Sequence, residues 1–267
     1  MEKVAEILAE AASEVVVPRF RALSAGEVME KAPGEVVTVA DREAEVIIAR
    51  RLRELLPVPV VGEEAVAADP ELANALLSEP AVWLVDPVDG TANFIAGRPD
   101  FAVMASLVRS GQTVASWIWQ PVSGTAYAAE LGAGAWRDGE RLTRRPATGT
   151  PGDWRGFIKG RFLAPADQRR LRANAAAFGR VAAGRSAAGV EYPDIAEGEQ
   201  EFILYNRTLP WDHAPGSLLV SEAGGVSARL DGSPYRPDPP GGEDGLLVAC
   251  DPETWEQTRA ILLRPAA

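Results

Sequence analysis

The amino-acid sequence predicts an α/β protein in two halves, an N-terminal α+β half over residues 1–145 and a smaller C-terminal α/β half over residues 146–267. Two segments with helical hydrophobic spacing precede a run of consecutive strand patterns in the first half. Strand and helix patterns alternate in the second half. Between the halves, Arg144–Asp153 (RRPATGTPGD) contains two prolines and two glycines, which makes it the best candidate for a junction.

The N-terminal half is predicted to begin with two helices. Glu2–Phe20 places its apolar residues on one stripe at helical spacing, and the segment from about Asp41 to Leu56 does the same until Pro57 ends it. The polar, glycine-containing segment between them, Arg21–Glu35, is expected to form an exposed loop or lid. A further short helix is expected over Glu71–Leu77.

Strand patterns dominate the rest of this half. Val58–Val61 is a short strand candidate, and the wholly apolar Ala81–Val85 (AVWLV) is typical of a strand buried on both faces. Asp138-Gly139 predicts a two-residue hairpin turn. Glycine or proline turns separate three more predicted strands, Phe101–Val108, Thr113–Gln120 and Thr125–Glu130.

In the C-terminal half the alternation of elements favours a mostly parallel sheet with helices packed on it. The predicted strands are Gly156–Lys159, Phe202–Tyr205, Val226–Leu230 and Leu246–Cys250. The predicted helices are Ala166–Phe178, His213–Ala223 and Pro252–Leu263, each with approximate ends.

Composition narrows the possible functions. The chain has 267 residues with 27 Lys+Arg against 38 Asp+Glu, and its net charge of −11 disfavours direct contact with nucleic acid. An anionic small substrate stays possible where bound cations invert the local field. No apolar run approaches the roughly 18 residues that span a bilayer, and the N-terminal segment lacks a secretory pattern. With a single cysteine, Cys250, these features predict a cytoplasmic protein that binds no membrane.

Two acidic residues follow the buried strand AVWLV directly, in the segment DPVDGTANF. Pro87 fixes one backbone angle and Gly90 permits a sharp turn, so the carboxylates of Asp86 and Asp89 can converge at the strand end. The backbone N–H groups of Gly90 and Thr91 would then be available to an anion. A solvated acidic turn is the alternative interpretation of this segment.

Three further acidic residues lie at element ends. Glu63 follows the strand Val58–Val61, Asp41 stands three residues after Thr38, and Asp212 precedes a predicted helix. Each alone also fits a plain role as a helix cap or a first-turn acid. Hard oxygen ligands are nevertheless what Mg²⁺ takes, and one histidine and one cysteine cannot build a zinc site. The pattern therefore indicates magnesium and phosphate chemistry, carried by Asp41, Glu63, Asp86, Asp89 and Asp212.

These segments resemble the inositol monophosphatase family of magnesium-dependent, lithium-sensitive sugar-phosphate phosphatases, and the chain looks like a bacterial member. WLVDPVDGTANF is similar to the first family signature and PWDHAPGSLLVSEAGG to the second, and GEE and the pair Thr38 and Asp41 occur upstream in the family's order. The resemblance covers essentially the whole chain. It implies the family's layered αβαβα fold, two or three bound Mg²⁺ ions and a homodimer.

The resemblance also implies the metal ligands. Glu63, Asp86 and the main-chain carbonyl of Val88 would hold the first Mg²⁺. Asp86, Asp89 and Asp212 would hold a second ion, with Asp86 bridging the two. Glu63 would also contact a third, weakly held ion through water and so belongs to the catalytic group.

Roles in catalysis and substrate binding follow from the same resemblance. Thr91 would orient the attacking water and, with Asp41, help to remove its proton. The Gly90 and Thr91 amides would bind the phosphate, and Lys31 would approach from the preceding loop. Asp89 and Asp212 also belong to the predicted substrate site.

The departures from the family pattern fall on the alcohol side of the substrate. The animal inositol enzymes have a glutamate seven residues before the aspartate of the Trp-Asp pair, and this chain has Tyr205 there. The usual Gly-Thr-Ala-Ala is replaced by Arg185-Ser186-Ala187-Ala188, in which Ser186 and Ala187 still fit a pocket wall while arginine is unusual. The predicted specificity residues are therefore Tyr205, Asn206 and Arg207.

The implied function is hydrolysis of a small sugar or polyol phosphate by in-line attack of a metal-activated water, with myo-inositol 1-phosphate as the first expectation. Histidinol phosphate, 3′-phosphoadenosine 5′-phosphate and fructose 1,6-bisphosphate are alternative substrates within the family. A protein-binding role in bacterial transcription is an alternative of another class. A haloacid-dehalogenase mechanism is disfavoured because it uses carboxylates two residues apart, and Asp86 and Asp89 are three apart.

Overall fold

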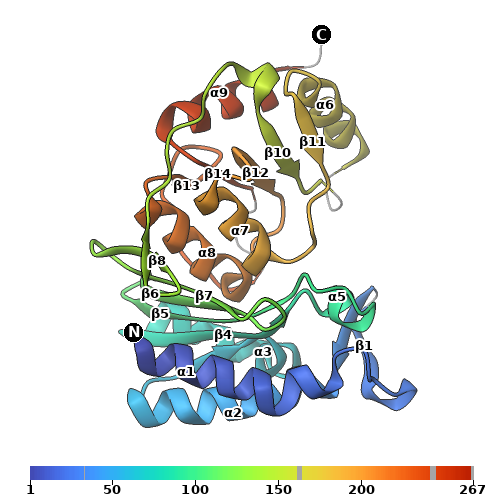
Figure 1. Cartoon of the computed structure of the whole chain (residues 1–267), viewed down its shortest axis with the longest axis vertical. Coiled ribbons are helices and arrows are strands. Elements are labelled where there is room, and N and C mark those ends of the chain that lie inside the picture. The colour runs from blue at the N-terminus through green and yellow to red at the C-terminus, as the bar shows by residue number, and fades with distance from the viewer. Residues whose placement is uncertain (33, 161–163, 241–244, 266–267) are drawn as a thin grey trace.

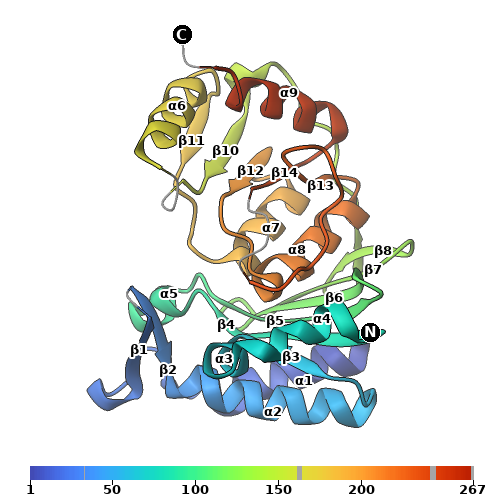
Figure 2. The same cartoon turned by 180° about the vertical axis from the view of Figure 1, so that it is seen from behind.

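The computed structural model describes residues 1–32, 34–160, 164–240 and 245–265. Figure 1 shows three layers of helices alternating with two sheets, and Figure 2 shows the same order from behind. The expected layered αβαβα fold is therefore confirmed. From bottom to top in Figure 1 the helix pairs are α1 (Glu2–Ala11) and α2 (Val39–Leu55), α7 (Ala188–Glu197) and α8 (Pro210–Ala223), and α6 (Pro165–Ala175) and α9 (Pro252–Leu262).

The lower sheet has seven strands in the order β3-β4-β5-β6-β7-β8-β9. The β3 strand is parallel to β4, and every other pair is antiparallel. At the predicted hairpin turn, Asp138 and Gly139 both adopt positive φ (50° and 82°), the conformation of a two-residue turn. The strands are β3 (Val60–Gly62), β4 (Ala81–Asp89), β5 (Ala102–Arg109), β6 (Gln112–Gln120), β7 (Thr125–Glu130), β8 (Gly134–Arg137) and β9 (Glu140–Leu142).

The β4 strand is longer than the apolar pattern predicts. It continues past Val85 to Asp89, and its pairing with β5 shifts register between Asp86 and Asp89. Pro87 lies inside this shift, where its missing N–H breaks the ladder without ending the strand. The irregularity holds Asp86 and Asp89, both buried, at the end of the central strand.

The upper sheet has five strands in the order β11-β10-β12-β14-β13. The β10 strand is parallel to β11 and β12, whereas β14 is antiparallel to β12 and β13. The expected mostly parallel sheet is thus wrong, because β13 and β14 are connected without a crossover helix. The strands are β10 (Arg155–Ile158), β11 (Arg180–Ala182), β12 (Phe202–Tyr205), β13 (Val226–Arg229) and β14 (Leu246–Ala249).

Three segments differ from their predicted form. The helix expected over Glu2–Phe20 is α-helical only to Ala11 and continues as a π-helical turn (Ala12–Val16) and a 3₁₀ turn (Val17–Arg19). The expected loop Arg21–Glu35 instead holds a 3₁₀ turn (Ala25–Glu27) and β1 (Val28–Ala32), which pairs with β2 (Glu35–Thr38); Pro33 lies outside the described residues. The helix expected over Glu71–Leu77 is a 3₁₀ turn (Pro70–Asn74) followed by α4 (Ala75–Ser78).

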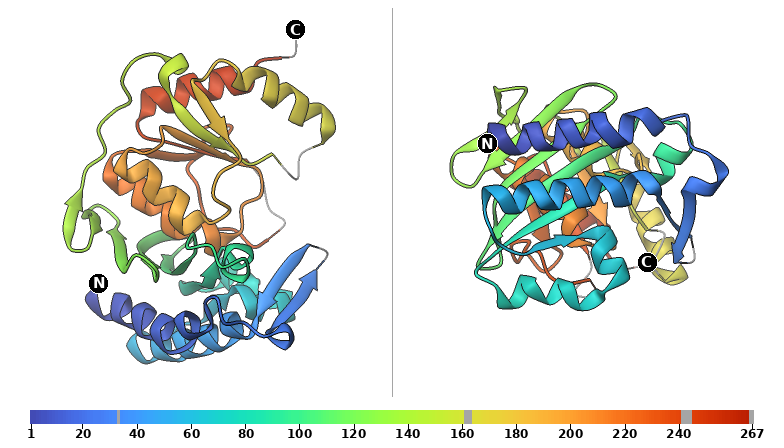
Figure 3. Two further views of the ribbon diagram at one scale, coloured as in Figure 1. Left: turned by 45° about the vertical axis from the view of Figure 1, so that its right-hand side comes forward. Right: turned by 90° about the horizontal axis from the view of Figure 1, so that it is seen from below.

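Three buried apolar clusters join the layers. One packs α1 and α2 on the outer face of the seven-stranded sheet, a second joins its inner face to α7 and α8, and a third joins the five-stranded sheet to α9. Figure 3 shows α1 and α2 side by side beneath the sheet. None of the helices in the described part of the chain is long and apolar enough to cross a membrane. Two short helices, α3 (Glu63–Ala68) and α5 (Thr91–Ile95), follow β3 and β4 directly.

Candidate active site

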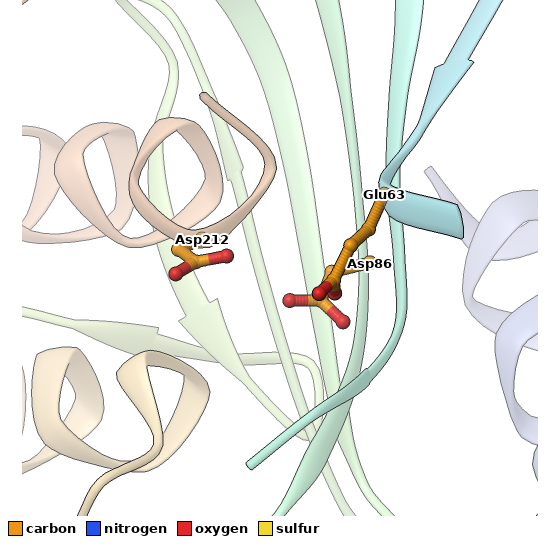
Figure 4. Close-up of side chains that lie close together, drawn as sticks. All are labelled: Glu63, Asp86 and Asp212. Atoms are coloured by element: carbon orange, nitrogen blue, oxygen red, sulfur yellow. The ribbon is translucent and has the colours of Figure 1, made fainter. Parts of the chain in front are cut away.

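Three carboxylates meet between the lower sheet and the middle helices, and we call them the carboxylate cluster: Glu63, Asp86 and Asp212. One oxygen of each lies within 4.8 Å of an oxygen of the other two. Figure 4 shows the three side chains pointing toward one another. Glu63 begins α3 and Asp86 lies in β4, whereas Asp212 is the third residue of α8. The α8 helix begins at Pro210 with Leu209 as its N-cap, so the plain capping role for Asp212 is wrong.

The cluster concentrates negative charge away from water. Burial raises the pKa of Asp86 well above its usual range, and the charges of Glu63, Asp89 and Asp212 raise it further. Burial and the charges of Glu63 and Asp89 do the same to the pKa of Asp212. Burial also raises the pKa of Glu63, against the opposing charge of Lys31. Buried like charges at this spacing are unfavourable until a cation joins them.

The donor set fits a hard divalent cation. All three groups offer carboxylate oxygens, which Mg²⁺ prefers, and no thiolate or imidazole belongs to the cluster. Lys31 of β1 approaches from one side, where its ammonium group pairs with Glu63 and, at 2.8 Å, with Glu64. The lysine thus faces the acids from the hairpin, on the segment expected to be a lid.

A second pair of predicted residues is joined beside the cluster. The Thr91 hydroxyl lies 2.9 Å from Asp41 Oδ1 and 3.0 Å from the carbonyl oxygen of Val88. The backbone N–H and the hydroxyl of Thr38 both donate to the other Asp41 oxygen, which forms the capping box that starts α2. Burial raises the pKa of Asp41, although hydrogen bonds from Thr38 and Thr91 oppose that rise.

Asp89 lies outside the cluster of three and is held by the start of α7. Its Oδ1 accepts the N–H of Ala188 at 3.1 Å, and its Oδ2 accepts the N–H of Gly189 at 2.6 Å. Burial raises the pKa of Asp89 to about 7 against these two hydrogen bonds. Gly90, with φ of 86°, caps α5, and a Cβ there would lie 2.9 Å from the carbonyl oxygen of Asp100. Only glycine suits that turn.

A cavity of about 380 Å³ opens beside these acids. Most of the predicted substrate residues line it, namely Asp89, Ser186, Ala187, Tyr205, Arg207 and Asp212. Lys31 lines a different cavity of about 340 Å³ together with Glu63, and Arg207 and Leu209 line both cavities. Asn206 lines a separate cavity of about 160 Å³ and not that of the site. Gly90 shapes the turn behind Asp89 without lining any of these three spaces.

Sequence reasoning missed three residues on the cavity wall. Lys159 directly follows β10, Glu191 lies in α7, and His213 follows Asp212. His213 Nε2 donates to the carbonyl of Arg207 at 3.0 Å, and its Nδ1 accepts from the Tyr192 hydroxyl at 2.9 Å. Burial lowers the pKa of His213 to about 3, so its ring is neutral. Lys159 had one available signal, since the chain has only three lysines.

Comparisons with known proteins agree on one family. The family model described as "Inositol monophosphatase family" matches residues 1–264. The inositol-1-monophosphatase of Rhizobium meliloti is 31% identical over 251 residues, with 88% of this chain and 85% of that protein covered. The Nus factor SuhB of Escherichia coli is 31% identical over 249 residues, covering 87% and 86%.

Solved structures agree in fold. The extragenic suppressor protein suhB of Bartonella henselae superposes with a TM-score of 0.79 at 24% identity, over 98% of this chain and 99% of that one. The family match spans every segment that forms the site, from Asp41 to Asp212. The chain therefore belongs to the inositol monophosphatase family, a family of phosphoric monoester hydrolases.

Proposed function

We propose that this protein is a magnesium-dependent, lithium-sensitive phosphatase of a small sugar or polyol phosphate, with myo-inositol 1-phosphate as its first substrate. The observation that carries the proposal is the carboxylate cluster, which lies near the Thr91–Asp41 pair and contributes Asp212 to the wall of a 380 Å³ cavity. A cavity of this size suits a polyol.

In this proposal the acids divide into two metal sites. Glu63, Asp86 and the Val88 carbonyl would hold one Mg²⁺, and Asp86, Asp89 and Asp212 would hold a second. Glu63 would also contact a third ion through water. When bound, Mg²⁺ would neutralise charge on the phosphate oxygens and lower the pKa of a bound water.

Side chains of the protein orient the attacking water and accept its proton in this proposal. Thr91 directs its hydroxyl proton at Asp41, so its oxygen keeps a lone pair to accept a hydrogen bond from the attacking water. Asp41 is a better proton acceptor than an exposed aspartate because burial raises its pKa. The Thr38 hydrogen bonds keep that carboxylate in place. The pair thus orients the water and receives its proton, while the Gly90 and Thr91 amides bind the phosphate.

In this proposal the residues of the cavity wall contact the alcohol part of the substrate. Ser186, Ala187 and Tyr205 line the cavity, and Arg207 stands at the point where it adjoins the Lys31 cavity. The Tyr205 hydroxyl donates to Glu191 at 3.0 Å, so this wall offers the substrate a phenol ring where the animal enzymes offer a glutamate. Histidinol phosphate, 3′-phosphoadenosine 5′-phosphate and fructose 1,6-bisphosphate are therefore the alternative substrates to test.

The test is phosphate release from these four esters, each with Mg²⁺, with EDTA, and with Mg²⁺ plus Li⁺. We expect magnesium-dependent, lithium-inhibited turnover of one ester above the others. Turnover that persists in EDTA would contradict the metal-dependent mechanism. A clear preference for an ester other than myo-inositol 1-phosphate would correct the substrate and keep the mechanism.

A second candidate function is a protein-binding role in bacterial transcription, favoured by the likeness to the Nus factor SuhB. It predicts Mg²⁺ binding without turnover of any of the four esters, together with capture of transcription proteins by the tagged chain. We also propose that the chain forms a homodimer, which light scattering after gel filtration would test.

A further inference from the structure

Glu191 is a buried acid that makes an unusually complete set of contacts. Its side chain is 1% exposed and pairs with the Lys159 ammonium group. Its Oε1 accepts the backbone N–H groups of Arg185 at 2.5 Å and Ser186 at 2.9 Å, and its Oε2 accepts the Tyr205 hydroxyl at 3.0 Å. Four donors from three segments match the roughly four acceptor sites of a carboxylate, as a buried charge requires, and they tie Glu191 to all three segments at once.

The two amide hydrogen bonds hold a turn that is otherwise unfavourable. Ser186 adopts a φ of 61°, in the left-handed region that side chains other than glycine, asparagine and aspartate rarely occupy. Gly184 precedes it with a φ of 89°, and a Cβ at that position would lie 2.4 Å from Glu191 Oε1. The turn therefore wraps closely around the carboxylate, which fixes its shape from inside.

This turn leads directly into the groups that hold Asp89. The next residues are Ala188 and Gly189, whose amides donate to the two Asp89 oxygens. Each amide occupies one lone pair of its oxygen and leaves the other to face a cation. The backbone at Gly189 also packs closely against β5, because a Cβ there would lie 2.5 Å from the Ala102 side chain. The position of the turn thus sets the direction of the Asp89 oxygens.

The outer side of the turn is tied to the lower half of the molecule. Asn93 donates to the backbone carbonyls of Arg185 at 2.8 Å and Asp100 at 2.7 Å. The Arg185 side chain pairs with Asp100 and Asp194, each at 3.0 Å. Arg185, which departs from the family pattern, therefore stabilises the outer side of the turn through ion pairs. Glu191 stabilises its inner side through hydrogen bonds to the backbone.

We propose that Glu191 is a positioning residue that holds the Gly184–Gly189 turn, through it orients Asp89, and so sets the affinity of the site for Mg²⁺. This inference rests on the metal site of the proposed function. In this inference Glu191 acts on the ion through the turn and not as a ligand: its Oε1 is occupied by Lys159 and two backbone amides, and its Oε2 accepts the Tyr205 hydroxyl.

The test is calorimetric titration of metal-free protein with Mg²⁺, which needs no turnover. E191Q keeps the size of the side chain but replaces one accepting oxygen by a donor. We expect it to weaken Mg²⁺ binding by about 10- to 100-fold, the usual effect of losing a residue that orients a metal ligand. D251N is the matched control, because Asp251 is also a buried acid that accepts backbone amides, from Ala147 and Thr254, at the far end of the five-stranded sheet. It should lower the melting temperature and leave Mg²⁺ affinity unchanged.

A second variant tests the route through the turn and covers the case in which E191Q folds poorly. Glycine accepts the left-handed conformation without help, so the double variant S186G/E191Q should fold better and recover part of the lost affinity. Wild-type affinity in folded E191Q, or an equal loss in D251N, would overturn the inference. Wild-type protein that binds Mg²⁺ but hydrolyses no ester would contradict the proposed function alone and leave this test intact.

Discussion

Two buried acidic regions of the site differ in how their charge is balanced. The carboxylate cluster brings three acids within 4.8 Å, with Lys31 as its neighbouring cation. Glu191, on the wall of the 380 Å³ cavity, instead receives four donors. Burial and mutual repulsion raise the pKa values of Asp86 and Asp212. The difference indicates that the cluster needs cations from solution to balance its charge, whereas donors within the chain already balance the charge of Glu191.

The largest effect is expected from removing the central charge of the cluster. D86N should lower turnover by at least about 1,000-fold, because it removes the ligand proposed to bridge two ions. The same change should stabilise the metal-free protein, since it removes a buried like charge. Steady-state kinetics and thermal unfolding in EDTA measure the two parts. Loss of both activity and metal-free stability would mean that Asp86 is satisfied within the fold, as Glu191 is.

The next effect tests the proton acceptor pair beside the cluster. T91A should lower kcat by about 100-fold and leave Mg²⁺ affinity unchanged, because the Thr91 side chain orients the attacking water and is not a ligand of the ion. T258A is the matched control, as Thr258 is a fully buried threonine in α9, away from the cavity. Kinetics at saturating Mg²⁺ and calorimetry separate the two readouts. A T91A variant that loses Mg²⁺ binding would assign Thr91 to the metal site instead.

Stability should also depend on pH in the metal-free protein. Burial raises the pKa of Asp89 to about 7 and likewise that of Glu45 to about 7, whereas in the unfolded chain both groups titrate near pH 4. The folded state holds these protons longer, so the free energy of unfolding should fall between about pH 4 and pH 7, by up to about 4 kcal/mol for each of the two groups. Urea unfolding in EDTA at several pH values measures this.

The same pH series at saturating Mg²⁺ separates the contributions of Asp89 and Glu45. Saturating Mg²⁺ should remove the part of the fall that belongs to Asp89, because the ion replaces its proton. The part that belongs to Glu45 should remain, since its oxygens accept the amides of Glu64 and Ala65 at 2.8 Å. An identical pH profile with and without Mg²⁺ would argue against Asp89 as a ligand.

The smallest effect is expected on the cavity wall. Y205F removes the hydroxyl that donates to Glu191 and leaves Lys159 and the two turn amides on that carboxylate. We therefore expect relative rates among the four esters to change by about 3- to 10-fold, and the Mg²⁺ dependence to change less than the relative rates. Y127F is the matched control, because Tyr127 donates to Glu197 at 2.8 Å outside the cavity. Rates that shift uniformly for all esters, or equally in Y127F, would remove Tyr205 from the specificity residues.

The sequence predicted well those parts that depend on local patterns. Apolar runs identified β4 and α2, and the capping pair Thr38 and Asp41 marked where α2 begins. The acids of the cluster could be named because each stands at an element end beside an apolar segment. Their convergence could not be derived from spacing alone, since the register shift inside β4 and the start of α8 at Pro210 decide where the side chains point.

The cavity wall was harder to predict for physical reasons. Gly189 and Pro193 interrupt the helical pattern of α7, so the helix that carries Glu191 gave no clear signal. Its role depends on backbone amides of a left-handed turn, which no spacing rule describes. The hairpin β1–β2 was not predicted, because Arg21–Glu35 is polar and contains glycine and Val28–Ala32 (VMEKA) has no regular alternation of apolar and polar residues. Tertiary contacts, not local propensity, fix these parts.

The most direct test of this account is the melting temperature of the wild-type protein and of D86N, each in EDTA and at about 100 times the dissociation constant of Mg²⁺. For the wild type, binding at that level contributes about 2.7 kcal/mol, so we expect a rise of about 5–10 °C. D86N should melt above the wild type in EDTA and respond little to Mg²⁺. A wild-type melting temperature that neither EDTA nor Mg²⁺ changes would contradict the claim that these acids are arranged for metal ions.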